Sequence, residues 1–211
     1  MAISRLVSWR PWFLLGGVLV VAGGLQHPRG GGMAAMLADP AWVPSHLLIL
    51  AGYAALAAGL FLFGRSAALP PGTARWTRLS FYAMVLSAAE MVLHTAASVD
   101  HGNLVAGHAA PVFTTHIWSA TVVQPILGLA IVGFILATAR ERTLASPWIA
   151  WLGIAGAVAH GAAPILVVAL GLGQFWILFP LVMLLALWFA VAALWPVRAG
   201  ARMESAELAE A

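Results

Sequence analysis

The stretch SAAEMVLHTAASVDHGNLVAGHAAPVFTTH, residues 87–116, separates two strongly apolar segments. It carries four of the chain's seven histidines, together with Glu90 and Asp100. The rest of the chain has few charges: of 211 residues, 63% are hydrophobic and only 8% are charged. Because a soluble domain is about one quarter charged, this composition predicts an integral membrane protein whose polar chemistry is concentrated in one place.

Missing residue types exclude several kinds of chemistry. The chain has no cysteine, which excludes disulfides, thiolate metal sites and cysteine nucleophiles. All ten basic residues are arginine, so Schiff-base chemistry on lysine, and with it a retinal protein, is excluded. The arginines stand singly or in pairs between apolar runs, where topology signals belong, and they do not indicate a nucleic-acid partner.

Six apolar segments are each long enough to approach the roughly 20 residues that a membrane-spanning helix needs. They predict an all-α bundle of six transmembrane helices over residues 1–197, followed by a short cytoplasmic tail over 198–211. The predicted spans are about 9–26, 43–63, 78–98, 114–138, 147–170 and 174–196.

The first segment allows a second interpretation, because its basic start and apolar run also fit a secretory signal peptide. It lacks a clear small-x-small cleavage site directly after the apolar run, so we expect an uncleaved helix. Pro11 suits the first turn of that helix, where its missing N–H is not needed.

The arginines predict the orientation. With six spans, nine of the ten fall on one side, and only Arg29 falls on the other. The side rich in arginine is expected to face the cytoplasm. Both termini are then cytoplasmic, and we expect a multi-pass protein of a bacterial-type cytoplasmic membrane.

All seven histidines then lie in the outer half of the bundle or beyond it. At about 1.5 Å per residue, His46 and His116 are expected roughly 3 Å below the outer interface and His94 roughly 6–8 Å below it. Glu90, Gln124 and His160 are expected deeper, at about 12–15 Å. Glu90 is the only acidic residue within a predicted span, and a buried carboxylate is costly unless it is paired or faces a polar cavity.

Helical spacing groups these polar residues on shared faces. Glu90 and His94 are four residues apart, as are Ala120 and Gln124 on a stripe that also contains His116. His46 and Tyr53 share a third face. Pro164 follows His160 by four residues and removes the helical hydrogen bond to its carbonyl, a construction found at membrane binding sites.

A weak repeat gives the same six segments a possible grouping. His27, His94 and His160 are spaced by 67 and 66 residues, and each stands near the outer end of an outward-running helix. This spacing suggests three helical hairpins, although chance explains so few matches equally well.

Imidazoles with one carboxylate and no thiolate suit a transition metal such as Zn, Cu or Fe. The sequence therefore predicts an outward-facing site that takes metal or a small ligand from the extracytoplasmic side, as a metalloenzyme or a metal-handling protein. Glu90 would be a ligand or a general base. No HExxH motif supports the assignment. The candidate ligands are Glu90, His94, His160, His46 and His116, with His101, His108 and Gln124 as secondary candidates.

Three other functions fit the same residues. A haem-b electron-transfer protein would use two histidines as axial ligands, with His46 and His116 as one pair and His94 and His160 as the other. A proton-coupled transporter would use Glu90 and His160 as its titrating pair. In a structural subunit of a larger complex, the histidines would only cap helices.

Some of these residues also have a purely structural interpretation. Glu90 and His94 would then satisfy one another as a buried pair, and Gln124 would join helices by a hydrogen bond. His27, His101 and His108 are expected to be solvated loop residues.

Overall fold

The computed structural model describes residues 8–30, 32–65, 69–144 and 146–195, and most of these residues are helical, with no strand among them. The predicted tail over 198–211, with Arg198 and Arg202, and the N-terminal Arg5 lie outside the described residues. The helices in chain order are α1 (Arg10–Gln26), α2 (Gly32–Ala38), α3 (Trp42–Arg65), α4 (Pro71–Ala96), η1 (Ala97–Asp100), α5 (His101–Val105), α6 (Pro111–Arg140), α7 (Pro147–Ala163), η2 (Pro164–Ala169), η3 (Gly173–Phe175), α8 (Leu178–Leu181) and α9 (Met183–Leu194).

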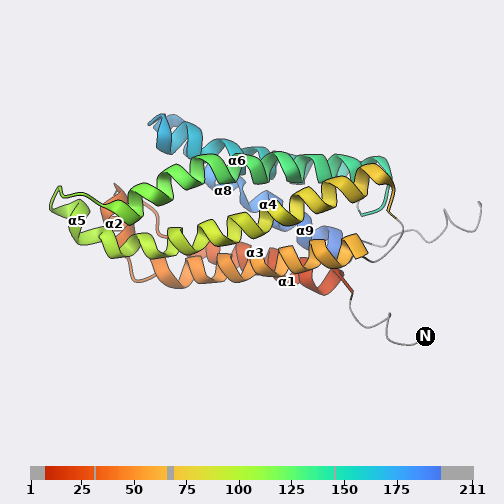
Figure 1. Ribbon diagram of the computed structural model, residues 1–211, viewed down its shortest axis with the longest axis horizontal. Helices are drawn as coiled ribbons and strands as arrows, with labels where there is room; N and C mark the ends of the chain where they lie inside the picture. The colour runs from red at the N-terminus through yellow and green to blue at the C-terminus, as the bar shows by residue number, and fades with distance from the viewer. Residues whose placement is uncertain (1–7, 31, 66–68, 145, 196–211) are drawn as a thin grey trace, which may run out of the picture.

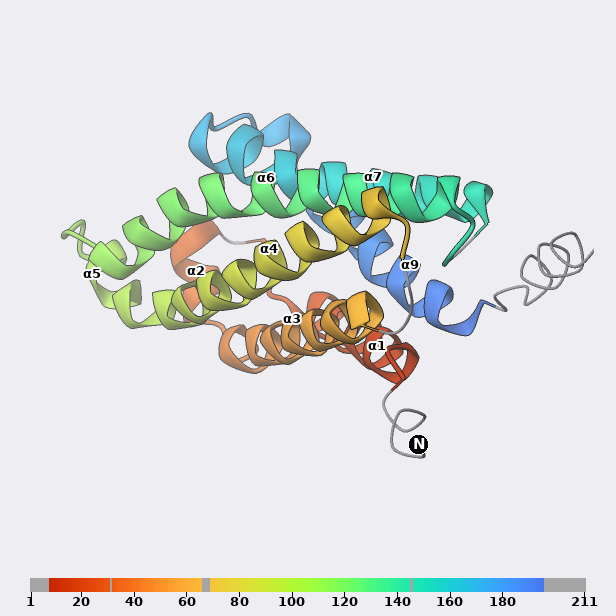
Figure 2. The same cartoon turned by 45° about the vertical axis from the view of Figure 1, so that its right-hand side comes forward.

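The long helices form a closed bundle. Following the chain through α1, α3, α4, α6, α7 and α9, each helix packs against the next, and α9 packs against α1 (Figure 2). The short helices α2 and α5 contact one another at one end of the bundle (Figure 1). At the opposite end lie the start of α1 and the ends of α3 and α6 (Figure 1).

Five helical stretches of the described chain are long and apolar enough to cross a membrane: Trp42–Arg65, Pro71–Val105, Pro111–Arg140, Pro147–Ala169 and Gly173–Leu194. The protein is therefore a helical, multi-pass membrane protein. Helix α1 has 17 residues and is not one of the five, although it packs beside them. The count of six spans and the orientation of the termini stay predictions.

Two segments differ from the limits predicted from hydropathy. Helix α4 begins at Pro71, one to two turns before the predicted start near 78, because polar side chains in its first turns are satisfied inside the bundle. Thr77 donates to the carbonyl of Thr73 at 2.7 Å, and Ser80 donates to that of Ala130 at 2.9 Å. The predicted span 174–196 is divided into η3, α8 and α9.

Pro164 interrupts the fifth long helix as the sequence predicts. The α-helical pattern ends at Ala163, and the chain continues as a π-helix over Pro164–Ala169. Proline has no N–H to give to the carbonyl four residues earlier, here that of His160, so the regular α-helical ladder stops at this point. The break lies within one turn of a buried histidine.

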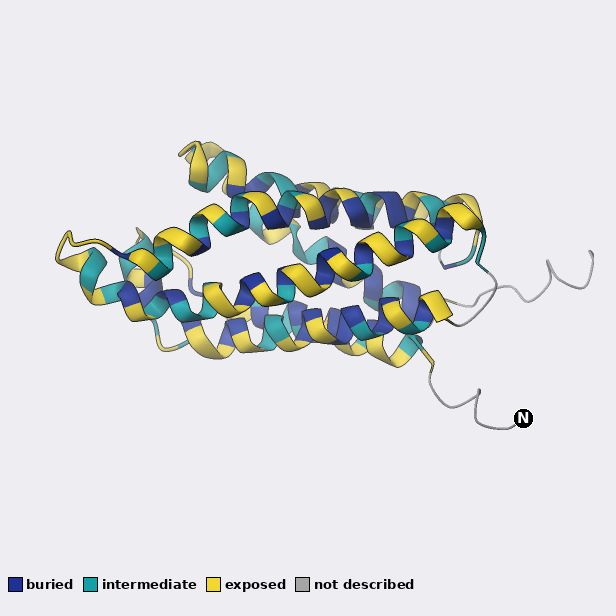
Figure 3. Cartoon of the chain, viewed as in Figure 1, coloured by how far each residue is buried: buried dark blue, intermediate teal, exposed yellow. Residues whose placement is uncertain are grey.

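The outward faces of the helices are apolar. Figure 3 shows exposed and buried residues alternating along each long helix, as expected of helices that have one inward face. Large apolar side chains such as Leu129, at 72% exposed, and Val122, at 60%, stand on the outward face in the middle of α6. Such a surface suits lipid rather than water.

Glycines let α1 and α3 approach closely at the end of the bundle that carries α2. A Cβ placed on Gly23 would lie 2.6 Å from the carbonyl oxygen of Ser45, and one on Gly16 would lie 2.8 Å from that of Gly52. Small residues at such crossings are typical of membrane helix pairs. The close contact fixes His46, the neighbour of Ser45, relative to the end of α1.

We expect Gly23→Ala to lower the free energy of unfolding by about 1–3 kcal/mol, because the new methyl group meets backbone that cannot move aside. The thermal midpoint of the protein in detergent reports this loss. Gly24→Ala is the matched control, since its Cβ would meet only the flexible side chain of Met183, at 3.2 Å. Equal midpoints for the two variants would contradict the proposed tight packing.

Candidate functional site

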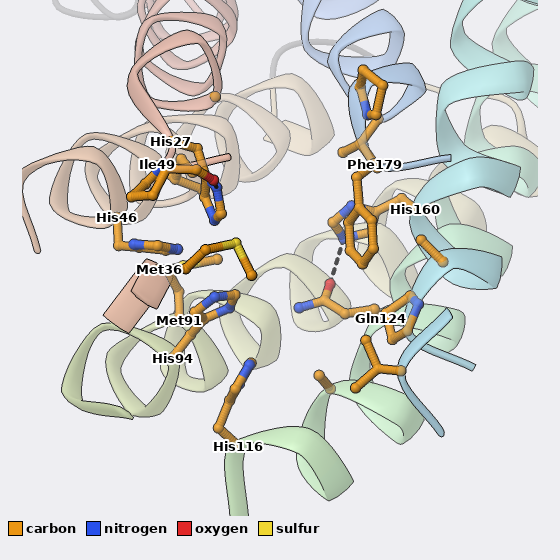
Figure 4. Close-up of a pocket in the computed structure, with 18 of the residues that line it drawn as sticks. His27, Met36, His46, Ile49, Met91, His94, His116, Gln124, His160 and Phe179 are labelled. Atoms are coloured by element: carbon orange, nitrogen blue, oxygen red, sulfur yellow. Dashed lines mark hydrogen bonds between the residues drawn. The ribbon is translucent and has the colours of Figure 1, made fainter. Parts of the chain in front are cut away.

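A cavity of about 420 Å³ lies inside the bundle, towards the end that carries α2. Its wall combines apolar side chains with five of the chain's seven histidines. Figure 4 shows these histidines together with Gln124 around the open space. The histidines on the wall are His27, His46, His94, His116 and His160.

His46 presents one ring nitrogen to the cavity without a partner. It lies in the first turns of α3 and is fully buried. Its Nδ1 lies 2.6 Å from the carbonyl oxygen of Trp42. Because a carbonyl only accepts, Nδ1 carries the proton and Nε2 keeps its lone pair. Among the described residues, Nε2 has no hydrogen-bond partner, so its lone pair is free to bind a ligand.

Glu90 orients the ring of His116 through a hydrogen bond to Nδ1, as the carbonyl of Trp42 orients the ring of His46. The Nδ1 of His116 donates to Oε1 of Glu90 at 2.6 Å, and the Nε2 of Gln124 donates to Oε2 at 2.8 Å. Both carboxylate oxygens thus accept hydrogen bonds, and these bonds offset the free-energy cost of burying a carboxylate within a membrane span. Since Nδ1 of His116 is protonated, its Nε2 carries the lone pair, and the ring points toward His94 (Figure 4).

The chain of hydrogen bonds continues to α7. His160 donates through Nε2 to Oε1 of Gln124, so the polar side chains of α4, α6 and α7 form one connected network. The ring of His160 also packs edge-on against Tyr53 of α3, with 6.1 Å between the ring centroids. His160 therefore supports Glu90 through Gln124 and does not lie beside the other histidines.

Four imidazole rings form a row in the order His27, His46, His94 and His116. The ring centroid of His94 lies 4.3 Å from that of His46 and 3.9 Å from that of His116. His27 extends the row, 4.7 Å from His46. Within the part of the chain that the structure describes, no hydrogen bond fixes the tautomer of His94, so either ring nitrogen can carry the lone pair that binds a ligand.

His27 was not predicted as part of the site. It follows α1, is half-buried, and its Nδ1 lies 2.8 Å from the carbonyl oxygen of Pro28. Burial lowers the pKa of His27. The hydrogen bond to Pro28 raises this pKa and partly offsets burial, whereas the positive charge of Arg29 lowers it further. The imidazole is thus neutral at neutral pH, the form that binds a metal ion. The expectation of a solvated loop residue was wrong because His27 packs under Trp42.

Trp42 covers the row of histidines. Its indole lies 4.2 Å from the ring of His46, 5.2 Å from that of His94 and 5.6 Å from that of His27. Its Nε1 donates to the carbonyl of Thr95 at 3.3 Å, which joins α3 to α4.

Two groups of side chains place one ligand atom each within 4.8 Å of the others, close enough to hold a metal ion after small adjustments. One group is His27, His46 and His94. The other is Glu90, His94 and His116. His94 belongs to both groups. Of the five main candidates predicted from the sequence, His160 belongs to neither group, and the secondary candidates His101, His108 and Gln124 also lie outside both.

The remaining polar residues of the loop hold the end of the bundle together. Asp100 is buried and accepts from Nδ2 of Asn103 at 3.1 Å and from the backbone N–H of Phe113 at 2.9 Å. His101 bonds through Nδ1 to the carbonyl of Ala34 at 2.9 Å, which fastens α2 to α5. His108 is exposed.

No protein-family model, curated protein or solved structure matches this chain.

We expect Glu90→Gln to destabilise the protein by about 2 kcal/mol, because the new amide group turns a donor toward His116 or Gln124 and removes the charge that both bind. The thermal midpoint in detergent measures the effect. Glu141→Gln is the matched control, since Glu141 is exposed at the end of α6. A midpoint unchanged in both variants would mean that the network contributes nothing to stability.

Proposed function

We propose that this protein binds a transition-metal ion at the row of histidines and acts as a metal-binding membrane protein. The single observation that carries the proposal is the tautomer pattern. His27, His46 and His116 each give Nδ1 to an acceptor, which leaves Nε2 free. Metal-ligating histidines almost always donate their other ring N–H to a carbonyl or carboxylate in this way.

The proposed ligands come from different elements of the bundle. His27 follows α1, His46 is on α3, His94 is on α4 and His116 is on α6. Because these elements pack directly against one another, the fold itself brings the imidazoles together. Glu90 would orient His116 and supply a compensating negative charge, while Gln124 and His160 hold Glu90 in place.

A metal bound by imidazole nitrogens explains the site better than a haem between two histidines. The proposed axial pair His46 and His116 has the ring of His94 between its members, at 4.3 and 3.9 Å from the two centroids. A porphyrin between them would have to occupy the same place. We therefore assign the histidines to a non-haem ion.

The cavity extends well beyond the ligands. Pockets for small molecules measure about 300–1,000 Å³, and this cavity of about 420 Å³ is within that range. A second ligand of the metal, such as a small substrate, therefore has room beside the ion. When bound, the metal would supply Lewis acidity to such a ligand.

We further propose that the site faces the extracytoplasmic side. The arginines at the start of α1, the end of α3, the start of α4 and the end of α6 lie at the end of the bundle opposite the site. An excess of arginine marks the cytoplasmic side. Metal would then enter from outside the cell.

We expect His94→Ala to abolish retention of metal, because His94 belongs to both candidate ligand groups. Elemental analysis and an optical spectrum of the same detergent-purified sample provide the measurement. His108→Ala is the matched control, since His108 is exposed and remote from the cavity wall. A Soret band, or equal metal content in both variants, would overturn the proposal.

The absence of cysteine allows a clean test of orientation. A side chain at Gly102 or at Gly72 would meet nothing within 4 Å, and the two positions lie at opposite ends of α4 and its extension. We expect an impermeant maleimide to label Gly102→Cys in intact cells and Gly72→Cys only after the membrane is opened. The reverse pattern would place the site on the cytoplasmic side.

A further inference from the structure

We infer that the ion held at this site is monovalent copper, bound by imidazole and thioether together. The inference rests on the proposed function and adds the identity of the metal. It starts from the methionines: four of the chain's seven line the same cavity as the histidines. The methionines on the wall are Met33, Met36, Met91 and Met183.

Two of these methionines stand beside the proposed ligands. Met91 precedes His94 by three residues, so both lie on the same face of α4. Met36 on α2 packs against Trp42, the residue that covers the histidines. Figure 4 shows Met36 and Met91 next to His46 and His94. Both methionine side chains are nearly inaccessible to solvent, at 6% and 4% exposed.

Helix α2 is held over the cavity by specific contacts. His101 binds the carbonyl of Ala34 at 2.9 Å, which fixes the turn between Met33 and Met36. On α9, the sulfur of Met183 lies 3.2 Å from the position that a Cβ on Gly24 would take, and Gly24 lies one turn before His27. Methionines from α2, α4 and α9 thus line the cavity that the histidines line.

The donor set selects among metals. Imidazole suits zinc, copper, iron and nickel, whereas thioether without thiolate favours Cu(I). Copper is the metal that both ligand types accept. Zinc has no comparable use for thioethers, since its protein ligands are thiolate, imidazole and carboxylate.

The charge of the site also favours a monovalent ion. Glu90 is the one carboxylate in either candidate ligand group. A monovalent ion beside the Glu90 carboxylate leaves this pair neutral, whereas a divalent ion leaves a net positive charge inside an apolar bundle, where uncompensated charge is costly.

The test is a pair of titrations on the full-length protein in detergent. Cu(I) is supplied under anaerobic conditions against a chromophoric Cu(I) chelator, and Zn(II) is supplied against a chromophoric zinc chelator. Ag(I) serves as a redox-inert probe of the same softness. We expect the wild-type protein to bind Cu(I) and Ag(I) far more tightly than Zn(II).

The double variant Met36→Leu with Met91→Leu removes the sulfur atoms at nearly constant volume, so the fold is expected to survive. We expect the affinity of this variant for Cu(I) to fall about tenfold or more, as it does when a residue that supports a metal site is lost. Its affinity for Zn(II) is expected to change little. Met84→Leu is the matched control: Met84 is buried on α4, at 1% exposed, away from this cavity.

The outcomes separate the two proposals. Tighter binding of Zn(II) than of Cu(I), or equal losses for both metals in the double variant, would overturn the copper assignment and leave the metal site standing. An unchanged Cu(I) affinity in the double variant would also overturn it. Failure of the wild-type protein to bind any of the three ions would overturn the proposed function itself.

Discussion

The burial of one carboxylate constrains the half of this bundle that contains the cavity. Glu90 is 3% exposed within a membrane span, where an unpaired charge is costly. Its two oxygens are satisfied by His116 and Gln124, both from α6, and Gln124 in turn accepts from His160 of α7. Three helices must therefore keep one rotation and one depth relative to each other, and the cavity lies within the space they define.

The histidines follow from this constraint and from the close approach of α1 and α3. Glu90 sets the ring of His116, while the backbone carbonyl of Trp42 sets the ring of His46. The glycines of α1 bring His27 against the same surface. The Nε2 of His46 is a fully buried nitrogen on the cavity wall that has no partner among the described residues.

Helical spacing was sufficient to predict much of the arrangement. A membrane protein of long helices follows from composition alone. His94, His116 and Gln124 do line one cavity, and Glu90 binds His116 and Gln124, because residues three and four apart share a helix face. The interruption at Pro164 also follows from one residue, since proline has no N–H to donate.

What spacing could not predict is how the helices meet. His160 was expected beside Glu90, but Gln124 stands between them, and only the relative rotation of α6 and α7 decides this. His27 was assigned to solvent because it follows a helix, and its burial depends on a tryptophan from another segment. The start of α4 was placed too late because hydropathy does not register hydroxyl groups that bond to backbone carbonyls.

The chain of hydrogen bonds from His160 through Gln124 to Glu90 has a fixed direction, since each donor points toward the carboxylate. Reversing any one member would set two donors or two acceptors against each other, so the side chains can only reorganise together. These side chains, on three helices, therefore adopt their rotamers when the protein folds. The conformational entropy that they lose is part of the free energy of folding. A ligand that reaches the cavity meets side chains that are already ordered, so little further ordering opposes its binding.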